Sequence, residues 1–319
     1  MNLLCAVLSL VVVLSGVGLP WLPAQAADMG KLAFVRGGNV WIAWSNGGSQ
    51  HQLTFSRQDR APTVSPDGRW VAFHSGMGED SGFGQLFMVH SQGGRLEQFR
   101  HPDLEGGEYP AFSQDGGSLV FAGLSNLRVK KEKDAEQAYA TMSVVIGDLK
   151  TGDLKKVVSS PGVALDTGYV YAHPALSPDG QVVAYQESGS DVSGGIVGVN
   201  LKGRRVFRFP KDQRDPTPVW RPSFSPDGRQ LLCYSPATNE RQSDVIYLID
   251  LDKGAKKKLA LGSSPTFVDQ GRAIVYEKWP PDRWEPKGPV KCDLWRLELK
   301  PGARPRLLIK DAEQPSGQM

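Results

Sequence analysis

The sequence is poor in cysteine and histidine, and it carries no large excess of either charge. Its 319 residues include 3 cysteines and 5 histidines, and 37 basic residues against 34 acidic ones give a formal net charge of +3. A net charge so close to zero gives no electrostatic argument for nucleic acid or a membrane surface as a partner. We therefore expect no nucleic-acid partner.

Familiar catalytic and metal-binding motifs are also missing. The chain has no Gly-x-Ser-x-Gly elbow, no His-Glu-x-x-His sequence and no phosphate-binding glycine loop. A metal site needs ligands that converge, and the histidines fall at unlike places in the chain. They are His51, His74, His90, His101 and His173. The sequence therefore predicts no catalytic residues, no metal site and no cofactor.

Charged side chains are absent altogether from residues 1–26. An apolar run covers residues 3–19, prolines follow it, and residues 24–26 (AQA) have the small-residue pattern of a signal-peptidase site. We interpret 1–26 as a cleaved signal peptide and 27–319 as the mature protein, which would be periplasmic and without stable membrane insertion. The alternative is an uncleaved membrane anchor, because no Lys or Arg stands near the first residue.

A repeated turn is the dominant feature of the remaining sequence. Complete copies are residues 62–68 (PTVSPDG), 174–180 (PALSPDG) and 222–228 (PSFSPDG), and looser copies are 110–116 (PAFSQDG) and 265–271 (PTFVDQG). Pro suits the second position of a turn, Asp hydrogen-bonds the local backbone, and Gly tolerates positive φ. Apolar residues flank each turn at a period of two, as in a half-buried β-hairpin. The predicted structural turn residues are Asp67, Gly68, Asp115, Gly116, Asp179, Gly180, Asp227 and Gly228.

The spacing of these repeats indicates the architecture. Their leading prolines follow one another at steps of 48, 64, 48 and 43 residues. Several strands in a unit of about 40–50 residues are typical of a β-propeller blade. Each unit continues into a third strand, a Gly-containing turn and a fourth strand, so the five repeats predict five four-stranded antiparallel blades.

A sixth blade is expected from the two ends of the chain. Residues 31–56 contain three predicted strands without a first strand, and residues 313–317 (EQPSG) are a truncated copy of the repeat. A C-terminal strand that completes the blade begun near the N-terminus would close the ring and remove free sheet edges. The predicted fold is therefore all-β, a six-bladed β-propeller in residues 27–319 that is closed by the C-terminal strand.

The repeat resembles that of the TolB-like propeller family. The family signature is a Pro, two residues, Ser-Pro-Asp-Gly and then a strand that ends in an aromatic residue; three copies here match it in full. The resemblance covers nearly all of the chain after residue 27, and it implies a propeller without the additional N-terminal α/β domain of TolB itself. It says little about function, because one propeller fold hosts many functions.

The register of the repeats also locates a candidate site. The residue before each repeat proline should enter the innermost strand and surround the mouth of the central channel. These residues are Ala61, Tyr109, His173, Arg221, Ser264 and Gln314. Arg60, Glu108 and Trp220 stand one place earlier. The side chains that could hold a polar or anionic ligand or a peptide terminus there are Arg60, Tyr109, His173, Trp220 and Arg221. The alternative is a solvated funnel without a specific ligand.

The long connections are expected on the same face as this mouth. They join second to third strands, at residues 75–84, 124–141, 187–195, 235–243 and 279–291. Loops on one face of a rigid scaffold commonly carry binding residues. Trp279 and Trp284 in the last loop are candidate partner contacts, and simple packing of that loop is the alternative.

The two cysteines beyond residue 26 are Cys233 and Cys292, which an exported protein could pair. Cys233, however, aligns with an aromatic residue in four other repeats. These aromatic residues are Phe73, Phe121, Tyr185 and Tyr276. That position should face the packing layer between blades, so we predict that Cys233 is a small buried apolar residue without a disulfide.

These observations predict an exported, non-enzymatic propeller that binds or scaffolds another protein or peptide of the cell envelope. They leave its oligomeric state open. The alternative is an enzyme at the channel mouth, a lyase or hydrolase of sugar polymers. It would use His173, Arg221, Tyr109 and Glu108. The two hypotheses differ in whether these four side chains converge.

Overall fold

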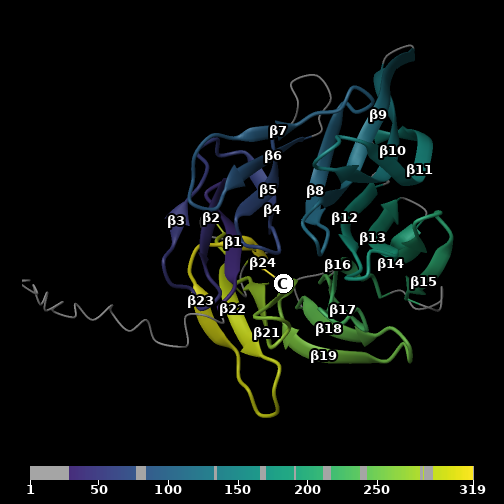
Figure 1. Cartoon of the computed structure of the whole chain (residues 1–319). Coiled ribbons are helices and arrows are strands. Elements are labelled where there is room, and N and C mark those ends of the chain that lie inside the picture. The colour runs from purple at the N-terminus through teal and green to yellow at the C-terminus, as the bar shows by residue number, and fades with distance from the viewer. Residues whose placement is uncertain are drawn as a thin grey trace, which may run out of the picture.

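A computed structural model describes most of the chain beyond the expected signal peptide. The described residues are 29–76, 84–132, 135–165, 170–189, 192–210, 217–237, 243–280, 283 and 290–318. They form six four-stranded antiparallel sheets, arranged as the blades of a propeller (Figure 1). The all-β prediction is therefore confirmed. Residues 1–26, interpreted above as a signal peptide, lie outside the described part.

Each blade runs outward from an innermost strand that lines the central channel. Blade 1 contains β24 (Glu313–Gly317), β1 (Lys31–Arg36), β2 (Asn39–Trp44) and β3 (His51–Gln52). Blade 2 contains β4 (Asp59–Val64), β5 (Trp70–Ser75), β6 (Gln85–His90) and β7 (Glu97–Phe99). Blade 3 contains β8 (Gly106–Phe112), β9 (Ser118–Glu132), β10 (Ala135–Asp148) and β11 (Leu154–Ala164).

The remaining blades use consecutive strands in the same order. Blade 4 contains β12 (Val170–Leu176), β13 (Val182–Gly189), β14 (Val192–Asn200) and β15 (Arg205–Phe209). Blade 5 contains β16 (Trp220–Phe224), β17 (Gln230–Ser235), β18 (Val245–Asp250) and β19 (Lys256–Leu261). Blade 6 contains β20 (Ser263–Val268), β21 (Ala273–Lys278), β22 (Asp293–Glu298) and β23 (Arg306–Ile309).

Ring closure by the C-terminal strand is confirmed. β24 pairs antiparallel with β1, with Leu32 opposite Gly317, and the amide of Gln318 donates to the carbonyl of Lys31 over 2.8 Å. β24 also packs against blade 6. A Cβ atom on Gly317 would lie 2.1 Å from the carbonyl oxygen of Phe267, so glycine is required for this close approach of two backbones.

The repeated turns owe their shape to one aspartate each. In blade 2, Asp67 Oδ1 accepts hydrogen bonds from Ser65 Oγ at 2.6 Å and from the Arg69 amide at 2.9 Å, and Gly68 has a φ of 69°. The pattern recurs three times. Its other members are Ser113 with Asp115, Ser177 with Asp179 and Ser225 with Asp227. These hydrogen bonds favour the carboxylate and lower the pKa of all four aspartates, that of Asp67 to about 2.

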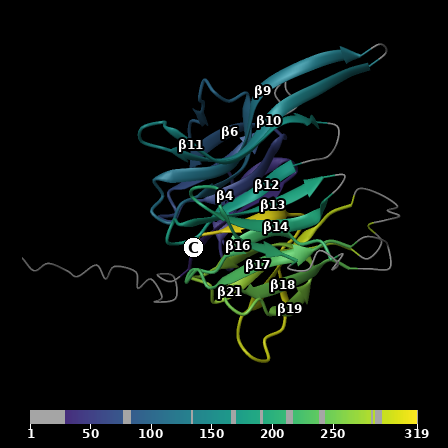
Figure 2. The same ribbon diagram turned by 90° about the vertical axis from the view of Figure 1, so that its right-hand side faces the viewer.

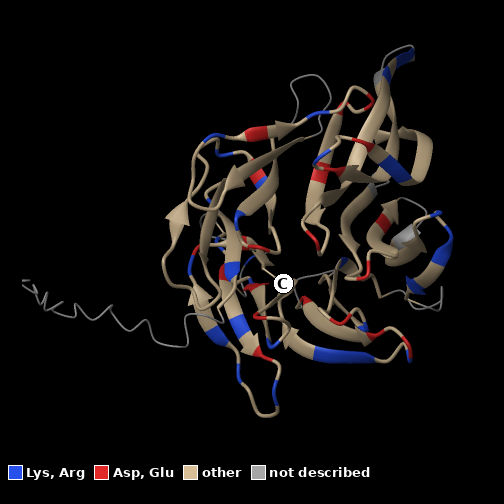
Figure 3. Ribbon diagram, in the orientation of Figure 1, with Lys and Arg blue, Asp and Glu red and all other residues tan. Residues whose placement is uncertain are grey.

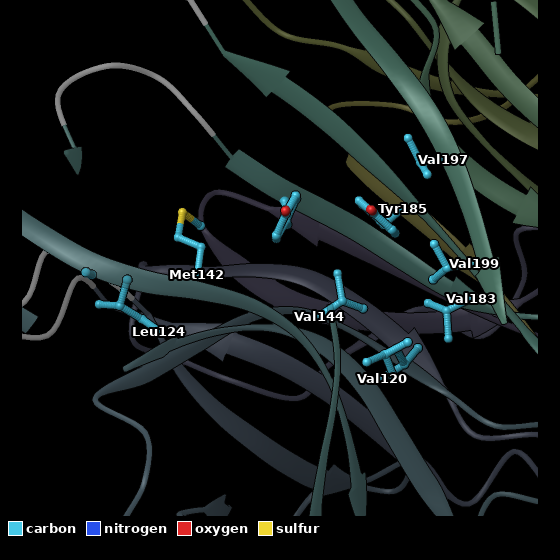
Figure 4. Packing of buried hydrophobic residues seen from close by; sticks show 11 residues of the cluster. Val120, Leu124, Met142, Val144, Val183, Tyr185, Val197 and Val199 are labelled. Carbon is cyan, nitrogen blue, oxygen red and sulfur yellow. The ribbon is translucent and has the colours of Figure 1, made fainter. Parts of the chain in front are cut away.

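The core consists of apolar layers between neighbouring blades. One layer joins Val120, Leu124, Met142 and Val144 of blade 3 to Val183, Tyr185, Val197 and Val199 of blade 4 (Figure 4). On each second strand, the residue at the position equivalent to Cys233 lies in such a layer, and its side chain is at most 3% exposed. These residues are Phe34, Phe73, Phe121, Tyr185, Cys233 and Tyr276. Cys233 and Cys292 are both buried and free, as expected for Cys233 in an apolar layer.

Two segments expected to be loops are strands instead. Most of residues 124–141 belongs to β9 and β10, which are 15 and 14 residues long. This hairpin projects beyond the rest of the ring (Figures 1 and 2). Similarly, β13 and β14 continue through most of residues 187–195. These stretches are rich in polar residues, with glycines in the second, which is typical of loops, whereas cross-strand pairing satisfies their backbone groups.

Charged residues of both signs are distributed around the ring (Figure 3). This distribution agrees with the small formal net charge of +3. The described part of the chain contains no helix with the length and hydropathy needed to cross a membrane.

Candidate functional site

The six residues that precede the repeat prolines share an uncommon backbone conformation. Their φ angles lie between 46° and 55°, in the left-handed region that residues other than glycine seldom adopt. These residues are Ala61, Tyr109, His173, Arg221, Ser264 and Gln314. The ladder shifts register at the same places, for example between Arg60 and Thr63. The conformation therefore belongs to a bulge in each innermost strand, which re-aims the backbone and side chain of one residue.

These six residues and the prolines after them line a channel on the propeller axis with a volume of about 150 Å³. The rest of the lining is apolar or polar and uncharged, including Thr63, Ala111 and Ser223. Arg221 is the only charged residue among the described residues that line the channel. An anionic group that enters the mouth would therefore meet one guanidinium and no carboxylate on the wall.

Side chains of the second strands accept hydrogen bonds from some of the bulge amides. The amide of Tyr109 donates to His74 Nδ1 at 3.2 Å, and the amide of Gln314 donates to Glu277 Oε1 at 2.7 Å. His74 and Glu277 occupy equivalent positions in their blades. Each is the cross-strand partner of the residue that precedes the bulge residue, Arg60 for His74 and Ser263 for Glu277. The amide of Ala61 donates instead to Gln314 Oε1 at 2.7 Å.

Four side chains from four consecutive blades form a contiguous row. The rings of His74 and Tyr109 are 5.2 Å apart between centroids, and those of Tyr109 and His173 are 4.0 Å apart. Arg221 Nε donates to His173 Nδ1 over 3.3 Å. The row therefore passes from blade 2 to blade 5, and three of its members, Tyr109, His173 and Arg221, line the channel.

The hydrogen bonds define which nitrogen of each histidine carries the proton. Nδ1 accepts a hydrogen bond in both His74 and His173, so in the neutral ring Nε2 must be the donor. Burial, with help from the charge of Arg60 on His74 and of Arg221 on His173, lowers both pKa values, that of His74 to about 4. Both rings are therefore neutral near pH 7, and each keeps an N–H that no described residue accepts.

Arg221 is held in place by a short relay. Its Nη1 donates to Ser264 Oγ, and Ser264 Oγ donates to Glu277 Oε2 at 2.9 Å. Ser263 Oγ donates to the same oxygen at 2.9 Å. Glu277 lies 3.9 Å from Arg221 Nη1. The carboxylate of Glu277 thus accepts two hydrogen bonds on Oε2 and, from the Gln314 amide, one on Oε1, while the Nη2 group of Arg221 has no acceptor among the described residues.

Two further carboxyl groups stand near the mouth but not on the channel wall. Glu108 Oε1 accepts from the amide of Gly84 at 3.2 Å. Burial raises the pKa of Glu108, and burial together with the charge of Glu277 raises the pKa of Glu313. Both environments disfavour the charged form.

Not all of the residues predicted for the mouth reach the channel. Arg60 and Trp220 are not among the residues that line it. Arg60 Nη1 bonds to the carbonyl of Asp59 at 2.8 Å, and the Trp220 indole packs against Gly194, with Nε1 buried and without an acceptor among the described residues. Arg60 and Trp220 stay paired in the ladder one place before the bulge, and of each such neighbouring pair only the bulge residue lies on the channel wall.

The two loop tryptophans have different outcomes. Trp279 Nε1 donates to Ser263 Oγ at 3.1 Å, so this residue supports the serine that holds Glu277. Trp284 lies outside the described residues, and its role as a partner contact stays a prediction.

Sequence reasoning did not identify His74 and Glu277 as supports of the bulge. A signal was present: each directly follows the aligned aromatic residue of its second strand, Phe73 and Tyr276. The sequence could not show that a side chain at this position faces the bulge amide of the next blade. No group of three or more His, Cys, Asp and Glu residues in the described part of the chain could hold a metal ion.

No protein-family model matches the sequence, and no curated protein is similar to it. Among solved structures, TolB from Acinetobacter baumannii is 18% identical with a TM-score of 0.64, over 91% of this chain and 66% of that one. A putative TolB from Agrobacterium tumefaciens is 15% identical with a TM-score of 0.56, over 88% and 89%. Oligogalacturonate lyase from Vibrio parahaemolyticus is 16% identical with a TM-score of 0.55, over 85% and 71%.

These similarities confirm the TolB-like six-bladed propeller fold. At such low identity they concern the fold alone, and the chain spans less than two thirds of the Acinetobacter protein. The neighbours include both TolB structures and a lyase, so the function has to be argued from the channel mouth.

Proposed function

We propose that this chain is an exported, non-enzymatic binding module of the cell envelope, which holds an acidic group of a partner protein or peptide at its channel mouth. The observation that carries the proposal is that Arg221 is the one charged residue among the described residues of the channel wall; Glu277, 3.9 Å from its Nη1, is not on that wall. A carboxylate is an acceptor-only group that a guanidinium can bind through two hydrogen bonds.

Two neighbours of Arg221 on the channel wall add further donors. His173 presents Nε2–H and Tyr109 presents its phenol hydroxyl, and burial raises the pKa of Tyr109 so that the hydroxyl keeps its proton. The lone pair on Nδ1 of His173 is already occupied by Arg221. Such a set of donors suits an anionic oxygen, and it is held in place before any ligand arrives.

The alternative is an enzyme that cleaves sugar polymers, for which the similarity of fold to oligogalacturonate lyase is an argument. Of the four residues considered for it, Tyr109, His173 and Arg221 lie together, whereas Glu108 bonds to Gly84. General base catalysis needs a free lone pair that faces the substrate. The histidine nitrogens that accept hydrogen bonds in this mouth are already engaged, which favours binding over catalysis.

The test compares the parent protein with two arginine variants as bait in an extract of the cell envelope. Arg221→Ala removes the channel cation, and Arg229→Ala removes an exposed arginine beside the turn on the opposite face of the same blade. We expect one protein to be retained by the parent and by Arg229→Ala but lost with Arg221→Ala. Retention by all three baits would contradict the proposed site.

A second assay addresses the enzyme hypothesis directly. The protein is incubated with oligogalacturonates, with and without manganese, because one solved oligogalacturonate lyase of similar fold is in complex with that metal. The ultraviolet absorbance of unsaturated products is followed. We expect no change in absorbance. Product formation that Arg221→Ala abolishes would overturn the non-enzymatic proposal and support the lyase.

Export is tested on the N-terminus of the mature protein. The charge-free apolar start and the small residues at 24–26 motivate the expectation that sequencing of envelope protein begins at Ala27. A membrane-bound protein that still begins at Met1 or Asn2 would show an uncleaved anchor instead.

A further inference from the structure

A second cavity lies away from the channel, between the neighbouring blades 2 and 3, whose strands β6, β7 and β8 are labelled in Figure 1. Its volume is about 510 Å³, within the range of about 300–1,000 Å³ that is typical of small-ligand pockets. Its lining comes from β6, β7, the connection after β7 and the first residues of β8. Among the described residues it shares no member with the channel wall, so it is a separate site.

The apolar part of this cavity belongs to the layer between the two blades. Leu86 and Phe99 are cross-strand partners, so their side chains share one face of blade 2. Leu86 is buried, and Phe99 and Leu104 are half-buried members of the same apolar cluster. On the blade 3 side, Gly106 and Gly107 line the cavity with backbone alone, and glycine in a strand is common where a ligand approaches the backbone closely. These surfaces suit the apolar body of a ligand.

The polar part of the cavity has one fixed positive charge and no carboxylate. Arg100 is the one residue of fixed charge among the described residues of the lining. It is exposed, and no described residue accepts a hydrogen bond from its guanidinium. His101 Nδ1 accepts from the amide of Asp103 at 3.1 Å, so the neutral ring donates through Nε2. Two donors of the lining therefore have no acceptor within the described part of the chain.

The other polar groups around the cavity are engaged. Gln98 Nε2 donates to Gln85 Oε1 at 3.4 Å, and Gln85 Nε2 donates to the carbonyl of Glu105 at 2.7 Å. The carboxyl group of Glu105 is turned to the amide of Leu127, which donates to Oε1 at 3.3 Å. Neither Asp103 nor Glu105 is among the residues that line the cavity. An anion at Arg100 would therefore meet no carboxylate on the described wall.

We infer that this cavity binds a small organic acid with an apolar body. The carboxylate would accept hydrogen bonds from Arg100 and His101, because it is an acceptor-only group that a guanidinium fork can hold through two hydrogen bonds. The body of the acid would pack on Leu86, Phe99 and Leu104. This site is additional to the channel mouth, and the inference does not depend on the proposed function.

The experiment screens small aromatic and aliphatic carboxylic acids, together with the primary amide of each, by ligand-observed NMR on the full-length mature protein. Acetate is included as a carboxylate without an apolar body. Dissociation constants of the acids that bind are then measured with the parent, Arg100→Ala, Arg95→Ala and Arg221→Ala. Arg95 is the matched control, an exposed arginine of the same blade that does not line the cavity. Arg221→Ala identifies acids that bind at the channel mouth, and thermal melts establish that each variant is folded.

We expect acids with an aromatic or branched body to bind, with affinity weaker by about fivefold or more for their amides and for Arg100→Ala. Binding to Arg95→Ala and Arg221→Ala should equal that of the parent. No binding by any acid, or equal binding of acids and their amides, would overturn the inference. Acids that lose affinity with Arg221→Ala but not with Arg100→Ala would also overturn it and would belong to the channel mouth. Acetate that binds as tightly as the best acid would show attraction of anions to Arg100 without use of the cavity, which contradicts the inference too.

Discussion

Arg221 Nε donates a hydrogen bond to Nδ1 of His173 over 3.3 Å, and this bond joins the innermost strands of blades 5 and 4. Because Nδ1 accepts, the imidazole presents Nε2–H, and the guanidinium keeps its Nη2 group for a ligand. This bond therefore links two properties. One is which nitrogen of His173 carries the proton, and the other is the orientation of Arg221, the one charged residue of the described channel wall.

Replacement of Arg221 by alanine should weaken binding of an acidic partner more than it weakens the fold. We expect a loss of about 1.5–3 kcal/mol in binding free energy, the usual value of a hydrogen bond to a charged group. The unfolding free energy should change less, because Glu277 keeps hydrogen bonds from Ser263, Ser264 and Gln314. Calorimetry with the captured partner, and thermal melts of the variant alone, measure the two effects. Equal losses in both measurements would contradict a binding role.

Gly317→Ala tests the closure of the ring. The added Cβ atom would lie 2.1 Å from the carbonyl oxygen of Phe267, so the closing strand must move away from blade 6. We expect a loss of about 1–3 kcal/mol in the free energy of unfolding, as for other overpacked sites. Gly117→Ala is the control, because its new Cβ would meet nothing closer than 3.5 Å. Denaturant unfolding of both variants decides the matter, and equal stability would show that the closing strand is loosely held.

Stability in acid should depend on the turn aspartates. The pKa of Asp67 is lowered to about 2, chiefly by hydrogen bonds from Ser65 and from the Arg69 amide. A lowered pKa means that the unfolded chain binds the proton first, so the contribution is present above about pH 4 and is lost as the pH falls toward 2. Thermal melts across this range should show a smaller loss for Asp67→Asn than for the parent. The exposed Asp252→Asn variant should behave like the parent; if Asp67→Asn does too, the turn bonds add no stability.

The buried histidines should make the fold sensitive to milder acid. The pKa of His74 is lowered from 6.5 to about 4 by burial and by the charges of Arg60 and Arg221. The unfolded state again takes up the proton first, so stability should fall as the pH drops from about 6.5 toward 4. His74→Gln, which keeps an acceptor for Tyr109, should reduce this slope in urea unfolding. His51→Gln, at an exposed position, should leave the slope unchanged; no difference between the two variants would refute the assignment.

Turn chemistry made the fold accessible from sequence. The residues of each Ser-Pro-Asp-Gly copy interact within a few positions of one another, as Ser65, Asp67 and Arg69 do, so the hairpins and their spacing could be recognised locally. The bulge residues could be located for the same reason, since a proline marks each of them. The length of the β9–β10 hairpin could not be recognised, because polar alternating sequence is compatible with both a loop and an exposed strand.

The sequence by itself determined the repeat, the blade count, the closing strand and the six residues at the channel mouth, because each of these follows from short-range pattern and register. Only the tertiary structure decided which of them act together. His74 supports Tyr109 across a blade boundary, and Glu277 supports Gln314 in the same way. Arg60 and Trp220 stay off the channel wall although they are next in sequence to residues on it. Such relations depend on how neighbouring blades are placed around the axis, and packing between residues far apart in the chain sets that placement.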